Sequence, residues 1–256
     1  MTFKEKVNSG VAVYGAHVNL SDTVITEIIS SLGYDFVWVD MEHTTISTEQ
    51  VYHHILAAHA HGTPVLVRVP QNDLTNTKRI LELNVDAIVF PMAENAAHAE
   101  ALLANTLYPP YGKRGCGPKG AVNYGLESEK EYYGQGHIDK ITRFVQIELK
   151  SAALEAEKIA KIPYLDGVIL GMHDLSGSIG RLGDIFCEEN MSLALPAIKA
   201  LKDAGKAVGI ATFATDEKTL SIYRDMGCTV FAAGADYEYI VKGARATLET
   251  LKKINE

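Results

Sequence analysis

The chain has 256 residues, 47% of them hydrophobic and 22% charged, and no linker or charge block divides it, which predicts one globular domain over residues 1–256. Its formal net charge of −8, without a basic stripe, argues against nucleic acid and anionic membranes as partners. The first residues lack the apolar core of a signal peptide, no run reaches the roughly 20 apolar residues of a membrane span, and three scattered cysteines favour a reducing, cytoplasmic location.

Strand-like and helix-like segments alternate along the chain. Eight short apolar runs predict β-strands, at residues 11–15, 36–40, 65–69, 87–91, 143–148, 167–171, 207–211 and 229–233. Helical periodicity appears at residues 22–32, 48–61, 75–83, 96–107, 152–161, 191–204, 217–226 and 237–251, and Ser47 and Gln50 resemble a capping box. Strands alternating with helices through short loops predict parallel pairing, and eight of them predict an α/β fold closed as a (β/α)8 TIM barrel.

One long segment interrupts this alternation. Residues 108–125, after the fourth strand, are too rich in Gly and Pro for a helix or strand. Loops of that size in compact enzymes are usually functional and often form a lid over the site, so this segment is expected to do the same. It contains no phosphate-binding fingerprint.

Ionisable and polar residues stand where the predicted strands end. The second strand runs into Asp40, Glu42 and His43, the third carries Arg68, and the fifth and sixth are followed by Glu148 and Asp174. The carboxyl ends of parallel barrel strands meet at one mouth, where TIM barrels carry their active sites. These side chains are therefore expected to converge.

Two carboxylates from neighbouring strands, Glu148 and Asp174, suit a hard divalent cation. The alternative for Asp174 is that it caps the following helix. Arg68 lies among Val and Leu, where a charge needs a partner or must face the mouth, so a structural buried ion pair is its alternative.

His43 is the candidate general base. Asp40, three residues earlier, is expected to orient its imidazole, whereas the alternative is a surface or packing histidine. Four further histidines, His53, His54, His59 and His61, contain no pair at i, i+4 and are interpreted as surface residues. Cys116 has no evident histidine partner and is not expected to be a nucleophile.

Together these residues resemble the HpcH/HpaI family of metal-dependent pyruvate aldolases, which includes 4-hydroxy-2-oxoheptanedioate, 2-dehydro-3-deoxyglucarate and 2-keto-3-deoxyrhamnonate aldolases. The resemblance runs nearly end to end. It rests on Val39-Asp40-Met41-Glu42-His43, Val67-Arg68-Val69-Pro70 with Asn72-Asp73, Val89-Phe90-Pro91-Met92, Tyr108-Pro109-Pro110 through Arg114-Gly115, Gln146-Ile147-Glu148, and Asp166-Gly167-Val168 through Asp174-Leu175-Ser176.

The resemblance implies a barrel of the phosphoenolpyruvate/pyruvate-domain type that cleaves a 4-hydroxy-2-keto acid reversibly to pyruvate and an aldehyde. It implies that Glu148 and Asp174 hold Mg²⁺, Mn²⁺ or Co²⁺, that Arg68 contacts the keto oxygen, and that His43 with Asp40 performs acid/base chemistry. Substrate contacts are then expected from Arg68, Gln146, His173 and Asp174, the carboxylate also taking backbone N–H groups between His173 and Leu175. A homo-hexamer, with the C-terminal helix packed on a neighbouring subunit, is also implied.

The chain departs from the family pattern at Met172 and His173, where relatives commonly carry Pro and a small residue, and at Glu82 and Asn84. These departures bear on the aldehyde rather than on pyruvate. Two rival functions stay open: a Schiff-base aldolase using Lys150, and a catalytically silent barrel that binds a keto acid.

Overall fold

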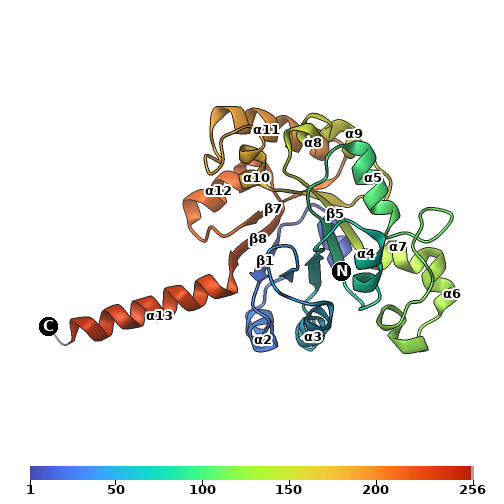
Figure 1. Cartoon of the computed structure of the whole chain (residues 1–256), viewed down its shortest axis with the longest axis horizontal. Coiled ribbons are helices and arrows are strands. Elements are labelled where there is room, and N and C mark those ends of the chain that lie inside the picture. The colour runs from blue at the N-terminus through green and yellow to red at the C-terminus, as the bar shows by residue number, and fades with distance from the viewer. Residues whose placement is uncertain (255–256) are drawn as a thin grey trace.

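The computed structural model describes residues 1–254 and shows a closed barrel of parallel strands in the order β1 to β8, with β1 also paired to β8 (Figure 1). The predicted (β/α)8 barrel is confirmed. Its strands are β1 (Val13–Val18), β2 (Phe36–Asp40), β3 (Val65–Arg68), β4 (Ala87–Phe90), β5 (Thr142–Ile147), β6 (Gly167–Leu170), β7 (Ala207–Thr212) and β8 (Val230–Ala235).

Helices precede, connect and follow the strands, and most of them form the outer layer (Figure 1). They are α1 (Phe3–Asn8), α2 (Thr23–Ser31), α3 (Thr48–His59), α4 (Leu74–Leu81), α5 (Ala96–Ala104), α6 (Glu129–Glu131), α7 (His137–Lys140), α8 (Lys150–Leu154), α9 (Ala156–Ile159), α10 (Met172–Gly177), α11 (Glu188–Asp203), α12 (Glu217–Met226) and α13 (Asp236–Lys253), with the shorter turns η1 (Gly120–Gly125) and η2 (Tyr132–Gly136). The predicted capping box at Ser47 and Gln50 starts α3. The helix predicted over 152–161 is divided into α8 and α9. No helix within residues 1–254 is long and apolar enough to cross a membrane.

Alternation along each strand builds two cores, because successive side chains point to opposite faces. One set fills the barrel, including Phe36, Trp38, Leu66 and Phe144. The other set faces the helices and forms the larger core. The strands are therefore apolar on both faces, as the sequence predicted.

Helix α1 closes the barrel at the N-terminal ends of the strands. Phe3 packs on Phe36 inside the barrel, with 5.3 Å between ring centroids. The Lys4 ammonium donates to the carbonyl oxygens of Ile138 and Ile141 and to the Asp166 carboxylate, at 2.8 to 3.0 Å. The opposite end, at the C-terminal ends of the strands, is the mouth.

The Gly/Pro-rich segment does not cover the mouth, because it follows α5 rather than β4 directly. It packs on the outside of the barrel, where a Cβ at Gly120 would meet the end of α4 and the Tyr124 hydroxyl lies 2.9 Å from that of Tyr52 on α3. The buried Arg114 organises it, stacking on Tyr108 and pairing with Glu82. The expected lid is therefore absent from the mouth of this chain's own barrel within residues 1–254.

Helix α13 leaves the barrel and extends away from it (Figure 1). Its Ile240, Val241 and Leu248 are about half exposed. Where the last helix of such a barrel would lie, over β8 and β1, there is a cavity of about 610 Å³ lined by Tyr14, Phe231 and other side chains.

Candidate active site

Inward-facing residues near the carboxyl ends of the strands meet in a cavity at the mouth. Its volume is about 300 Å³. The residues that line it are His17, His43, Arg68, Gln146, Gly171, Met172, His173, Asp174, Ala211, Thr212 and Phe213. Each of the predicted site residues lies in this lining or contacts it. The strand ends therefore converge at one mouth, as the sequence predicted.

Arg68 is the centre of the site's hydrogen-bond network. Its Nε and Nη2 donate to the two oxygens of Asp40 at 2.9 and 2.6 Å. Its Nη1 lies 3.0 Å from a Glu42 oxygen and 3.4 Å from Gln146 Oε1. The register pairs Asp40 with Arg68 across β2 and β3, so the two-bond contact follows from the strand alignment.

This pairing corrects the expected partnership of Asp40 with His43. Burial alone would raise the pKa of Asp40, but the hydrogen bonds and charge of Arg68 hold it below its ordinary value. His43 is instead 67% exposed, with Nε2 3.6 Å from Glu42. The physical reason is register: Asp40 points into the barrel toward β3, whereas His43 lies beyond the strand in the turn that follows it.

Gln146 links the arginine to Glu148. Its Nε2 donates to Glu148 Oε2 at 2.8 Å, while its Oε1 faces Arg68. The other Glu148 oxygen accepts from the backbone amide of Met92, which has a positive φ of 53°. A methionine backbone in the left-handed region is uncommon, and here this conformation directs the Met92 amide at a buried carboxylate.

Gly171 makes room for that carboxylate. A Cβ at this position would lie 2.6 Å from Glu148 Cβ and would also overlap the carboxylate, closer than real Cβ contacts occur. The absence of a side chain at the end of β6 therefore leaves room for the buried Glu148 carboxylate.

Burial raises the pKa of Glu148 to about 7, and the nearby Glu42 and Asp174 carboxylates push in the same direction. Four carboxylates, those of Asp40, Glu42, Glu148 and Asp174, thus interact with one another or with the guanidinium of Arg68. A bound cation would relieve their mutual repulsion.

The donor set fits a divalent metal that keeps several waters. Glu148 and Asp174 supply hard oxygen ligands, which is what Mg²⁺ uses in enzyme sites. Within residues 1–254, no three His, Cys, Asp or Glu side chains are arranged to hold a metal by themselves. Substrate oxygens and waters would complete the coordination.

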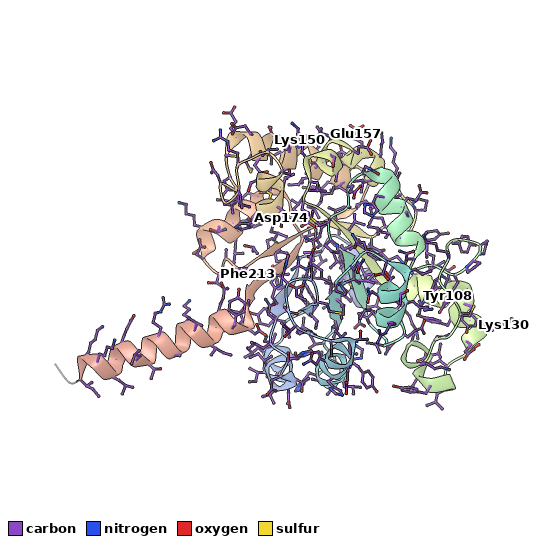
Figure 2. The ribbon with its side chains drawn as sticks, in the orientation of Figure 1. Tyr108, Lys130, Lys150, Glu157, Asp174 and Phe213 are labelled. Atoms are coloured by element: carbon purple, nitrogen blue, oxygen red, sulfur yellow. The ribbon has the colours of Figure 1, made fainter. Side chains whose placement is uncertain are left out.

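The start of α10, where the sequence predicted backbone N–H groups for the substrate carboxylate, lies at the mouth. Asp174 and His173 are exposed in the first turn of α10, near Phe213 on the same side of the barrel (Figure 2). The Leu175 amide donates to the Gly171 carbonyl, so the three amides before it, those of Met172, His173 and Asp174, have no partner within the helix. Asp174 is not a side-chain cap in the structure, because α10 begins at Met172.

Lys150 does not belong to the cavity. It is the exposed first residue of α8 and lies near the edge of the molecule (Figure 2). Among residues 1–254, no lysine lines the mouth. The histidines of α3 also stay outside it. His54, however, is fully buried against Thr26 at 2.7 Å, which corrects the interpretation of all four as surface residues.

His17, Glu42 and Phe213 are among the residues at the mouth to which sequence reasoning gave no role. His17 was lost because the first strand was ended at residue 15, whereas β1 continues to Val18. The signal was present, since Val13, Gly15 and His17 share one face of an alternating strand. Glu42 was noticed but given no role, and Phe213 carries no signal of its own.

The sequence matches the family described as HpcH/HpaI aldolase/citrate lyase over residues 14–242. The chain belongs to this family. Among relatives, it is 28% identical to a hydroxypyruvate/pyruvate aldolase of Roseobacter denitrificans over 96% of this chain and 94% of that one. A hydroxypyruvate/pyruvate aldolase of Deinococcus radiodurans is 30% identical over 98% of this chain and 90% of that protein. The structure of an HpcH/HpaI family protein from Burkholderia cenocepacia superposes with a TM-score of 0.89 at 28% identity, covering 97% and 98% of the two chains.

Membership of the HpcH/HpaI family, with members named as aldolases, makes this chain a lyase of the aldolase type. The catalytically silent alternative is thereby set aside. The family's fold is the barrel seen here.

Proposed function

We propose that the chain cleaves a 4-hydroxy-2-keto acid reversibly to pyruvate and an aldehyde. The observation that carries this proposal is the buried Arg68 guanidinium facing a small cavity beside the Glu148 and Asp174 carboxylates. When the bond between C3 and C4 breaks, its electron pair becomes the enolate of pyruvate. A site built for this reaction needs positive charge where that oxyanion develops.

Arg68 would donate to the developing oxyanion. Asp40 holds two of its nitrogens, so the guanidinium is fixed in the plane from which Nη1 reaches the cavity. The 3.4 Å contact of Nη1 with Gln146 is the weakest of its bonds and the easiest to exchange for a substrate oxygen. Asp40 is therefore a positioning residue.

His43 would take the proton from the C4 hydroxyl oxygen as the bond breaks and return it in the reverse reaction. It lines the cavity, and its Nε2 has only the long 3.6 Å contact with Glu42. General-base catalysis of this kind contributes about 10²- to 10⁴-fold in rate.

Glu148 and Asp174 would hold the divalent cation, for which Mg²⁺, Mn²⁺ and Co²⁺ are the candidates. Bound there, it would supply Lewis acidity to the oxygens of the keto acid. The amides of His173 and Asp174 would take the substrate carboxylate.

A panel of aldehydes mixed with pyruvate tests the proposal, with chelator and then metal added. We expect condensation that stops with chelator and returns with Mn²⁺ or Mg²⁺. An enzyme that stays active in chelator and is inactivated by borohydride plus pyruvate would establish a Schiff base, with Lys150 as its candidate.

We also propose that the chain assembles through α13, as a homo-hexamer. The half-exposed apolar residues of α13 and the open cavity over β8 and β1 complement each other, and one chain cannot bring them together while α13 extends outward. A second copy's α13 would fill the position of the missing barrel helix.

Light scattering tests this assembly. The wild type should have the mass of six chains of 27.9 kDa, and an Ile240→Glu, Val241→Glu double variant should shift to smaller species. A Lys242→Glu variant on the same helix is the control. A monomeric wild type would contradict the proposal.

A further inference from the structure

His17 is a buried histidine at the mouth that the chemistry above does not use. It is 3% exposed and stands between two aromatic rings, with centroids 5.1 Å from Trp38 and 5.4 Å from Phe213. It nevertheless lines the cavity. Its surroundings fix both its protonation and its tautomer.

The tautomer follows from one contact. Nε2 lies 3.3 Å from the Ala232 carbonyl oxygen, and a carbonyl only accepts, so Nε2 carries the hydrogen. Burial, and then the charge of Arg68, lower the pKa of His17 to about 4, so the ring is neutral. Nδ1 therefore has a free lone pair.

That lone pair is open to the cavity. Within residues 1–254, Nδ1 has no hydrogen-bond partner. It is also not fully enclosed, since the enclosed side-chain atoms without a partner do not include it. It is thus an acceptor that a ligand can reach. A neutral acceptor on an aromatic wall suits a hydroxyl group.

The barrel order tells which part of the substrate lies there. Arg68 and Gln146, on β3 and β5, bind the keto acid in the proposed function, whereas β1 lies across an eight-stranded ring from β5. His17, Thr212 and Phe213 therefore face the part of the substrate beyond the C3–C4 bond. That part is the aldehyde.

The charges on this side exclude an anionic aldehyde. His17 is neutral and Phe213 apolar, and Arg68 is already paired with Asp40 and Glu42. A carboxylate at the far end of the aldehyde would find no cation on the β7, β8 and β1 side of the lining.

Resting on the proposed function, we propose that His17 is a specificity-determining residue whose Nδ1 accepts a hydrogen bond from a hydroxyl of the aldehyde. The substrate class is then a neutral, short hydroxyaldehyde. Glycolaldehyde represents it, propionaldehyde is its isostere without the hydroxyl, and succinic semialdehyde is the anionic comparison.

The experiment measures kcat/KM for condensation of each aldehyde with pyruvate and follows the ratio of glycolaldehyde to propionaldehyde, in which intrinsic reactivity cancels between variants. His17→Phe keeps the aromatic contacts and removes the acceptor, and His17→Leu serves if the first variant does not fold. The ratio should fall about fivefold to tenfold, the value of one neutral hydrogen bond. His17→Gln, which keeps an acceptor, should retain most of the ratio, and His53→Phe on the outer face of α3 should leave it unchanged. Succinic semialdehyde should be a poor substrate for the wild type.

An unchanged ratio in a folded His17→Phe or His17→Leu enzyme would overturn the inference. The inference would also be overturned if the His17 variant lost the preference between hydroxypyruvate and pyruvate as keto acid while the glycolaldehyde-to-propionaldehyde ratio stayed constant. Nδ1 would then face the keto acid. Exchange of the pyruvate methyl protons for deuterium separates the two levels. If the wild type shows exchange but the ratio does not move, this inference alone fails; if it shows neither exchange nor condensation, the proposed function fails with it.

Discussion

Replacing Arg68 with lysine tests whether the guanidinium acts on the reaction or only on the fold. The fork makes two bonds to Asp40 and one close contact with Glu42. A lysine ammonium is a single point and cannot reproduce that planar set. At least one oxygen of the buried Asp40 would lose its partner, although the Glu42 amide still donates to the other at 2.9 Å.

The two expected effects differ in size. Losing one partner of a buried carboxylate costs about 1–3 kcal/mol of unfolding free energy. Losing the donor to the oxyanion lowers kcat about 10²- to 10³-fold, which corresponds to about 2.7–4 kcal/mol. Urea unfolding gives the first quantity, and initial rates of cleavage at saturating substrate and Mn²⁺ give the second.

Arg181→Lys is the matched control, since Arg181 pairs with Glu189 and both side chains are more than half exposed. We expect it to leave kcat at the wild-type value and to change stability by less than about 1 kcal/mol. If Arg68→Lys is destabilised but turns over at a rate near that of the wild type, Arg68 is a structural residue and the account of the oxyanion is wrong.

Three further predictions follow from other parts of the structure. Gly171→Ala should displace Glu148 and so lower the affinity for Mn²⁺, measured by calorimetry, about 10- to 100-fold. Gly134→Ala is the control and should leave the affinity unchanged, because a Cβ there meets nothing within 4 Å. His43→Ala should reduce cleavage about 10²-fold or more while Mn²⁺ still binds; loss of the metal would make His43 a ligand instead. Burial lowers the pKa of His54 and His137 to about 4, below the ordinary 6.5. Between these two values the unfolded chain binds more protons than the folded chain. The free energy of unfolding should therefore fall as pH drops from about 6.5 toward 4, by up to about 1.4 kcal/mol per pH unit for each histidine. His17, whose pKa is also lowered to about 4, adds to this fall. Burial raises the pKa of Glu148 to about 7 and also raises that of Glu42, so these carboxyls oppose the fall, and the three histidines are expected to outweigh them. Urea midpoints at pH 7 and pH 5 check the sign of the net effect, and equal midpoints would contradict it.

Much of the fold could be predicted because the barrel is built from repeated local signals. The strands are apolar on both faces and four of them, the second, third, fifth and sixth, run into ionisable groups, so Asp40, Arg68 and Glu148 were predicted at the mouth from the sequence alone. Closure at eight strands followed from their number. These signals lie within a few residues of one another, which is why sequence patterns capture them.

The parts that could not be predicted depend on register and on distant packing. The choice of Arg68 rather than His43 as the partner of Asp40 is set by the alignment of β2 with β3. The 108–125 segment was misplaced for another reason: the helix predicted over 96–107, observed as α5, already intervenes after β4 and carries the chain to the other end of the barrel. His17 required two more residues of β1, and strand ends are the least certain feature of any sequence interpretation.

The pairing of β1 with β8 also bears on how the chain is made. Val13 lies beside Val230, so the first strand acquires its second neighbour only after more than two hundred further residues have been synthesised. Helix α1 waits as well, since Lys4 binds groups at 138, 141 and 166. A nascent chain therefore exposes an unpaired apolar strand edge at its N-terminal end until translation is nearly complete, and edges of this kind invite association with other chains. Closure of the barrel therefore depends on the last strand, β8.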